Sequence, residues 1–540
     1  MAWLLFGSGA VLPVAGFARG YAAARRAMTP FVHEGEPTRT AIESLRQSSG
    51  AAADRYETVI GIEIHCQLKT VSKMFCSCST DYDGAAPNSH CCPVCLGLPG
   101  ALPTINRRAV EHVLATGLAI GGTVPEATRW DRKNYFYPDL PKGYQISQYD
   151  LPLASHGHLA IETSEGPFTV GIRRAHLEED TAKLIHAPGA DGTRVSLVDF
   201  NRSGAPLMEI VTEPDIRTAE QARRYAEELQ LVMRAIGASD AEMENGQMRV
   251  EANVSLRLRG APEFGTRVEV KNMNSFRSVE RAIAYEIARQ AAALDAGESL
   301  TMETRGWDDG RQATYHMRPK EQSDDYRYFP EPDLPPLHID AAWLASIGDA
   351  LPELPAARRT RYRGTLGLSA YDAAVIVNDP NMSAAFEEIL AVAPDLPAKE
   401  VANLVSGEYG RHAREIAERG ETGLVGLAEA RSLAHLVRSI VSGSISRTSA
   451  RDVLAIHLRS GRATAEIIAR EGFAQISDTG ALDAAVDAAL AANPAAVADY
   501  RAGKAQAVGF LVGQVMKATR GQANAAMVTD ALRRRLDAGG

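Results

Sequence analysis

The 540-residue sequence lacks the short motifs that mark several common chemistries. It has no G-x-G-x-x-G turn for a dinucleotide and no G-x-S-x-G elbow for a nucleophilic serine. Gly503-Lys504 is not a phosphate-binding loop, because Ala498 stands where an earlier glycine is needed and Ala505 where Ser or Thr should follow. A Ser-rich amidase signature is also missing, so the chain is not expected to release ammonia from an amide by itself.

Long apolar runs are scarce as well, and aromatic residues make up only 6% of the chain. No segment beyond the N-terminal region reaches the about 20 apolar residues of a membrane span, so no membrane partner is expected. Acidic residues outnumber basic ones, 67 to 58, and the net charge is −9. A nucleic-acid partner must therefore meet a local basic surface. Residues 401–540 are the less anionic part, with 17 basic and 14 acidic side chains.

The first 33 residues contain no Asp or Glu, but they contain arginines and an uncharged run at positions 2–18. That run is short for a membrane span and lacks the basic start of a secretory signal. We therefore expect residues 1–55 to be an extension, disordered or counted from a misassigned start, and the protein to be cytoplasmic. The alternative is a transit peptide in residues 1–33, which would make the protein mitochondrial or plastid.

All six cysteines fall between Cys66 and Cys95, too close together for a disulfide framework in a long chain without an export signal. Two closely spaced pairs stand out, thirteen residues apart: Cys76 with Cys78, and Cys92 with Cys95. Two such knuckles can close a tetrahedral zinc site, which is usually structural. The alternative is a set of buried cysteines without metal.

Three segments alternate apolar and polar residues, as half-buried strands do: residues 59–65, 250–258 and 267–271. In the first, Glu63 and His65 share the polar face. Glu251 and Asn253 share that of the second, and Glu269 lies with Lys271 on that of the third. Three strands with matched functional groups predict a common polar floor.

Helices are expected between and after these strands. Thr218 and Gln221 form a capping-box pattern for a helix that ends before Gly237, and Ser449 with Asp452 predicts the start of another. Beyond a Pro-rich stretch at 329–336, the pattern becomes Ala- and Leu-rich with helical periodicity. We expect a catalytic domain at 56–355 with zinc knuckles at 76–95, a helical connector at 356–395, and a helical tail domain at 396–540.

Dense polar strings fill the front half: GIEIH (61–65), RKNYFYPDLPKGYQISQYD (132–150), HLEED (176–180), DFNRSGAPLMEIVTEPD (199–215), EVKNMNSF (269–276) and DDYRYFPEPDLPP (324–336). With CPVCLGLPG (92–100) and GFLVGQVMKATRGQAN (509–524), they closely resemble the GatB family, the B subunits of aspartyl/glutamyl-tRNA(Asn/Gln) amidotransferases. The resemblance covers residues 56–540.

The resemblance implies an α+β catalytic "cradle" domain with a mixed or antiparallel sheet and a small zinc-ribbon-like insertion, followed by all-α regions. It implies ATP-dependent phosphorylation of the side-chain carboxylate on misacylated Glu-tRNA(Gln) or Asp-tRNA(Asn), and amidation by ammonia. The expected cofactors are ATP, Mg²⁺ and structural Zn²⁺. The expected partners are a glutaminase of the amidase family and a small third protein, which complete a heterotrimer, and the misacylated tRNA.

The resemblance also implies roles for individual residues. A magnesium site is expected at His65, Glu178 and Glu209, with Glu63 beside them and Glu179 as a competitor of Glu178. Lys271 completes the expected catalytic set, and zinc is expected at the four paired cysteines. From their residue types and their places in the polar strings, rather than from the resemblance, the expected substrate and nucleotide residues are Tyr137, Asp139, Lys142, Tyr144, Gln148, Arg202 and Asn272. The alternative for these seven is structural hydrogen bonding. The expected tRNA contacts are Lys504, Lys517, Arg520, Arg533, Arg534 and Arg535.

Two other classes of function compete with this interpretation. One is an ATP-dependent ligase acting on a free small acid, and the other is a non-catalytic module that binds zinc and RNA. Substitution of the acidic residues and assays on free glutamate would distinguish the three.

Overall fold

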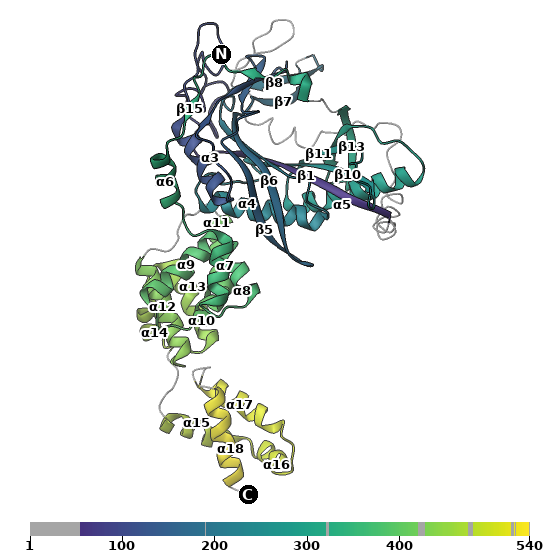
Figure 1. Cartoon of the computed structure of the whole chain (residues 1–540). Coiled ribbons are helices and arrows are strands. Elements are labelled where there is room, and N and C mark those ends of the chain that lie inside the picture. Colours follow the sequence, from purple (N-terminus) through teal and green to yellow (C-terminus); the bar gives the residue numbers. More distant parts are fainter. Residues whose placement is uncertain are drawn as a thin grey trace. The chain divides into compact units, whose positions relative to one another are not determined.

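A computed structural model of the chain describes residues 55–540, except 190, 320–322, 419–426, 474–478, 520–522, 524 and 539–540. The expectations for residues 1–54 and for Arg520 therefore lie outside the described residues. The chain divides into two compact units, one ending at residue 354 and the other beginning at residue 355. Figure 1 shows strands gathered in the first unit and helices alone in the second.

An eight-stranded sheet forms the centre of the first unit. Its order is β13-β12-β11-β10-β1-β9-β6-β5, and every pair is antiparallel except β11 and β12. The strands are β1 (Tyr56–Gln67), β5 (Ala154–Thr163), β6 (Gly166–Glu179), β9 (Pro206–Thr212), β10 (Met248–Leu258), β11 (Val268–Met273), β12 (Glu303–Asp308) and β13 (Ala313–Pro319). The expected mixed sheet is confirmed.

Three small sheets stand around the large one. They are β14-β3-β4 (Phe329–Pro330, Asp131–Asn134 and Tyr144–Ser147), β15-β2 (Leu337–His338 and Ala127–Thr128), and β7-β8 (Lys183–Pro188 and Arg194–Asp199). The β14-β3-β4 sheet brings part of the string at residues 132–150 to the polar side of the large sheet.

Helices α3 (Arg107–Ala119), α4 (Ala219–Ala235) and α5 (Phe276–Asp295) pack against one face of the large sheet. That face is apolar because of strand alternation: Ile60, Ile62 and Ile64 are fully buried in one core with the helices. The capping box of Thr218 and Gln221 begins α4 as expected. With one face covered by helices, the other face is left for polar side chains.

The second unit is helical throughout its described part. Its α-helices are α7 (Pro355–Gly364), α8 (Ala370–Val377), α9 (Pro380–Val392), α10 (Ala398–Leu404), α11 (Gly410–Glu418), α12 (Leu427–Val441), α13 (Arg447–Ser460), α14 (Thr464–Glu471), α15 (Thr479–Ala492), α16 (Pro494–Arg501), α17 (Ala507–Ala518) and α18 (Ala525–Ala538). A π-helix, η3 (Val405–Tyr409), follows α10, and α6 (Ala341–Asp349) belongs to the first unit.

These helices form two hydrophobic cores. One joins residues from Tyr362 to Ile467, and the other joins residues from Leu482 to Leu536. The segment expected as a connector, 356–395, therefore shares its core with the helices up to α14. One predicted helix start was wrong: α13 is capped by Ser446, whose hydroxyl accepts from Ser449 N–H, and not by Ser449. No helix in the described part of the chain is long and apolar enough to cross a membrane.

Candidate active site

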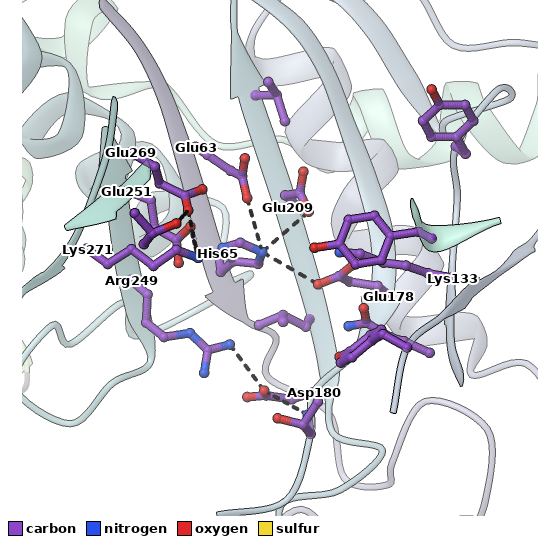
Figure 2. Close-up of a pocket in the computed structure, with 18 of the residues that line it drawn as sticks. Glu63, His65, Lys133, Glu178, Asp180, Glu209, Arg249, Glu251, Glu269 and Lys271 are labelled. Atoms are coloured by element: carbon purple, nitrogen blue, oxygen red, sulfur yellow. Dashed lines mark hydrogen bonds and ion pairs between the residues drawn. The ribbon is translucent and has the colours of Figure 1, made fainter. Parts of the chain in front are cut away.

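Four ionisable side chains meet where β1, β9 and β6 lie next to one another. The register places His65 of β1 opposite Glu209 of β9, and Glu209 opposite His176 of β6. Glu178 follows His176 by two residues and so points to the same face of the sheet. His65 Nε2 lies 3.3 Å from Glu209 Oε2 and 3.6 Å from Glu178 Oε1, and Figure 2 shows these side chains converging.

Three of these four side chains, His65, Glu178 and Glu209, line a cavity of about 770 Å³ that extends over β10 and β11. On β1, Glu63 Oε1 lies 3.8 Å from His65 Nε2. On the next two strands, Lys271 Nζ of β11 lies 2.7 Å from Glu251 Oε2 of β10. Glu269 lines the cavity beside them. The expected polar floor is confirmed, because alternate residues of β1, β10 and β11 face one shared space.

Cationic side chains border the carboxylates of this cavity. Lys133 enters from β3, Arg174 from β6 and Arg249 from β10. Arg174 Nη2 lies 3.6 Å from Glu209 Oε1, and Arg249 Nη2 lies 3.2 Å from Asp180 Oδ1. A cavity with both signs of charge suits a ligand that brings phosphate groups together with a metal cation.

Burial and neighbouring charges set the protonation of the cluster. Burial, with Glu209 and Glu251 nearby, raises the pKa of Glu63 to about 7. Burial alone would lower the pKa of His65, but the hydrogen bond to Glu209 and the surrounding carboxylates raise it to about 9. Burial lowers the pKa of His176 to about 3, so this imidazole is neutral. Without a bound cation, His65 is therefore protonated and offsets the nearby carboxylates together with Lys133 and Arg174. To ligate a metal cation, this imidazole must first lose its proton.

The cluster fits a divalent cation by its chemistry. One ligand atom each from His65, Glu178 and Glu209 lies within 4.8 Å of the others, and both carboxylates are buried. Two buried carboxylates this close need a shared proton or cation. Glu63 and Glu251 form a second such group with His65. Magnesium prefers carboxylate oxygens, so the glutamates suit it better than the imidazole does.

The predicted substrate residues do not all reach this cavity. Tyr137 lines it. Lys142 and Tyr144 line a different cavity of about 220 Å³, where Lys142 is paired with Glu179. Arg202 lines another cavity, of about 1510 Å³, and donates to the carbonyls of Thr181 and Ala182.

The other three predicted residues lie in structural positions. Gln148 is buried and bonds to Thr128 Oγ1 and the Leu177 amide. Asp139 accepts a hydrogen bond from Thr181 and lies outside the residues that line the acidic cavity. Asn272 has a φ of 63° and donates to the Tyr315 hydroxyl. The seven predicted pocket residues are thus distributed over several surfaces.

The residues that sequence reasoning missed are His176, Lys133, Arg174, Arg249 and Asp180, together with tyrosines at positions 135, 149, 326 and 328. Strand alternation could have found Arg249, which precedes Glu251 by two residues on the polar face. The tyrosines lay within the polar strings but carried no spacing signal. Tyr149 and Tyr328 stack with ring centroids 4.3 Å apart, which joins two distant strings.

The four paired cysteines also converge. Their Sγ atoms lie within 4.8 Å of one another, and Cys92 N–H donates to Cys95 Sγ at 3.2 Å. Four thiolates around zinc would be about 3.8 Å apart, given Zn–S bonds of about 2.3 Å. Cys66 is buried on β1 and is not part of this group of four. The donor set therefore fits zinc.

The fold and the site together define a class of protein: an α+β catalytic domain whose polar sheet face holds a histidine–carboxylate cluster, followed by a helical region. Two family models match the chain. The GatB/GatE catalytic domain covers residues 58–345, and the GatB domain covers residues 384–536. The chain belongs to the GatB family.

Curated relatives match over nearly their full length. The B subunit of the aspartyl/glutamyl-tRNA(Asn/Gln) amidotransferase of Moorella thermoacetica is 51% identical over 483 residues, which cover 89% of this chain and 100% of that protein. The protein of the same name from Carboxydothermus hydrogenoformans is 48% identical, covering 89% of this chain and 99% of its own length. The protein of the same name from Picosynechococcus sp. is 47% identical, and the match covers 89% of this chain and 98% of that protein.

Proposed function

We propose that the chain is the part of a tRNA-dependent amidotransferase that activates and amidates a tRNA-borne acid. It uses ATP to phosphorylate the side-chain carboxylate of misacylated Glu-tRNA(Gln), Asp-tRNA(Asn) or both. Ammonia from a partner glutaminase then displaces the phosphate. The observation that carries the proposal is the cavity in which His65, Glu178 and Glu209 meet across three neighbouring strands.

The chemistry explains why such a cavity is needed. A carboxylate is a poor electrophile because its leaving group would be an oxide, whereas an acyl phosphate has a good leaving group that a neutral amine can displace. Phosphoryl transfer depends on positioning and on neutralising charge. A site for it needs cations and fixed donors around the phosphate oxygens.

The residues of the cavity supply these needs. His65, Glu178 and Glu209 are the proposed holders of Mg²⁺, with Glu63 beside them; bound there, the ion would neutralise phosphate charge. Lys271 and Arg249 present positive charge from β11 and β10, so they can orient phosphate oxygens. Their counter-ions, Glu251 and Asp180, hold these side chains in place.

The remaining parts of the proposal concern zinc, partners and location. The cysteine cluster would hold structural zinc, and the tail would contact tRNA through its exposed basic side chains. A glutaminase of the amidase family would provide ammonia, consistent with the missing amidase signature, and a small third protein would complete a heterotrimer. The cytoplasmic location expected from the sequence belongs to this proposal too.

The test follows phosphate release and amide formation on each misacylated tRNA, with glutamine or ammonia as donor, in the assembled complex. Glu178→Gln and Glu209→Gln should each lower ammonia-dependent amidation by about a hundredfold or more, because a buried ligand of the cation is lost. Glu298→Gln, at an exposed position, is the matched control and should behave as wild type. Full activity of both cavity variants would contradict the proposal.

The same assays separate the two competing functions. A ligase for a free small acid would form amide from free glutamate without tRNA. A non-catalytic zinc and RNA module would leave ammonia-dependent amidation unchanged in both glutamate variants.

A further inference from the structure

Lys73 is a buried lysine beside the cysteine cluster, and only 1% of its surface is exposed. Its Nζ donates to the carbonyls of His90 and Phe200, at 2.8 and 3.2 Å, and lies 3.7 Å from Cys95 Sγ. Among the described residues, no carboxylate lies within ion-pair distance of this ammonium. Glu179 and Lys73 both lie close to Gly204, but the ion pair of Glu179 is with Lys142.

A buried ammonium needs compensation of two kinds. Its protons need acceptors, and the two carbonyls with the sulfur supply three. Its charge needs an opposite charge nearby, because transferring an isolated ion out of water costs many kcal/mol and carbonyl dipoles offset only part of that. The hydrogen bonds alone therefore leave the burial of Lys73 unexplained.

The cysteine cluster can provide the missing charge. Zinc held by four thiolates has a net charge of −2, since the ion brings two positive charges and the ligands four negative ones. Cys95 is the thiol next to Lys73, with its Sγ 3.7 Å from the ammonium nitrogen. The ammonium thus lies beside a centre that is anionic when loaded.

Lys73 also joins the two knuckles through separate groups. Its backbone N–H donates to the carbonyl of Cys78 in the first knuckle, at 2.9 Å. Its side chain reaches Cys95 and the carbonyl of His90 in the second. Asn106 Nδ2 holds the Lys73 carbonyl from the start of α3. Lys73 therefore links the two knuckles by hydrogen bonds and also places a positive charge beside the four cysteines.

We propose that Lys73 is the counter-charge of a four-thiolate zinc centre, and that it slows loss of the metal by neutralising part of the centre's negative charge. This inference rests on the proposed zinc site at Cys76, Cys78, Cys92 and Cys95. It assigns Lys73 a positioning role toward the metal and no part in the amidation chemistry.

The test compares zinc retention in the full chain for wild type, Lys73→Met and Lys73→Arg. Lys73→Met keeps the length of the side chain but removes its charge, and Lys73→Arg keeps the charge. Lys69→Met is the matched control, because Lys69 is half exposed and pairs with Asp240. Zinc content is measured by atomic emission, release by a chelator-coupled dye, and folding by circular dichroism.

We expect one zinc per wild-type chain, release at least tenfold faster from Lys73→Met, slower release from Lys73→Arg than from Lys73→Met, and wild-type behaviour of Lys69→Met. Cobalt substitution adds an independent readout, since the sulfur-to-cobalt charge-transfer bands should shift in Lys73→Met alone. Equal release rates and equal spectra in all four proteins would overturn the inference while leaving the zinc site intact.

A measurement on the wild type alone covers the case in which Lys73→Met does not fold. An amine-reactive reagent followed by mass spectrometry should label Lys73 much faster after the metal is removed than before. An unchanged labelling rate would overturn the inference. If wild type held no zinc and all six cysteines reacted as free thiols, the zinc site and the role of Lys73 would both be rejected, but the proposed amidation would not.

Discussion

At the scale of single residues, Glu178 and Glu179 have adjacent places in the chain but opposite surroundings. Glu178 faces the acidic cavity with His65, while Glu179 accepts from the Ile146 amide and pairs with Lys142 beside a different cavity. Both are at least 97% buried, so composition and burial do not distinguish them. Strand alternation does, because it sends neighbouring side chains to opposite faces.

We predict that Glu179→Gln lowers stability without removing the proposed chemistry. The Lys142 side chain is only 9% exposed, and loss of its partner would leave a poorly compensated charge that costs about 3 kcal/mol. All four tryptophans lie before residue 355, so denaturation followed by their fluorescence reports on the first unit. Amidation per folded molecule should stay within a few-fold of wild type, in contrast to Glu178→Gln. Unchanged stability of Glu179→Gln would contradict the pairing.

Asp180 provides a prediction about pH. Burial raises its pKa, but Arg249, Arg202 and Gln67 outweigh burial and bring the pKa to about 2. A folded-state value below the unfolded value of about 3.9 means that the carboxylate stabilises the fold above about pH 4 and loses this contribution as the pH falls toward 2. The contribution at neutral pH is about 2.5 kcal/mol.

The difference in unfolding free energy between wild type and Asp180→Asn should therefore be about 2.5 kcal/mol at pH 6 and should shrink as the pH falls below 4. Urea denaturation at a series of pH values measures it. A difference that stays constant down to pH 2 would show that Asp180 does not carry this pH dependence.

The polar floor could be predicted from the sequence, because the alternation within a single strand is enough to show which of its residues share a face. The row of His65, Glu209 and His176 could not, because it depends on the register of three strands that are far apart in the chain. Lys133 escaped prediction for the same reason, since it reaches the cavity from a separate small sheet. Local periodicity carries no information on which strands become neighbours.

At the scale of elements, helix starts were predicted well where one capping residue had no rival. Thr218 is such a case, and its hydroxyl accepts from Gln221 N–H while the Gln221 side chain returns to the cap. Around the start of α13, serine or threonine occupies positions 442, 444, 446, 448 and 449, so several caps were possible and the wrong one was chosen. Only the path of the chain into the helix decides between equivalent hydroxyls.

We predict that Thr218→Ala destabilises the first unit by about 1 kcal/mol, because the amide of Gln221 loses its acceptor. Thr218→Ser keeps the hydroxyl and should lie within about 0.5 kcal/mol of wild type. Tryptophan fluorescence during urea denaturation measures both. Equal losses in the two variants would mean that the methyl group matters and the cap does not.

Loops were the least predictable elements. The segment 135–144 contains prolines and polar residues in a pattern typical of a binding loop, and its strand partners in the β14-β3-β4 sheet were invisible in the sequence. Pairing of β3 with β4 directs Tyr137 to the acidic cavity but sends Lys142 and Tyr144 to a neighbouring one. The composition of a loop thus indicated a functional region without indicating which side each residue faces.

At the scale of the whole molecule, the acidic cavity and the basic side chains of the tail belong to different units. The last core, residues 482–536, carries the basic side chains expected to contact tRNA. Arg535 pairs with Asp483 and Asp487, and Lys504 with Asp499, so these two cations already have partners within the tail. Lys517, Arg533 and Arg534 are exposed and are better placed to meet phosphates.

We therefore predict that replacing Lys517, Arg533 and Arg534 with alanine weakens tRNA binding and makes it less dependent on salt. Each lost phosphate contact should reduce the slope of log affinity against log salt by about 1, so the triple variant should lose about 2 to 3. Amidation at saturating tRNA should stay near wild type, because the cavity residues are unchanged. Arg535→Ala is the matched control: it should lower the stability of the tail and leave the salt slope unchanged. A triple variant with the wild-type slope would place the RNA-binding surface on another part of the protein.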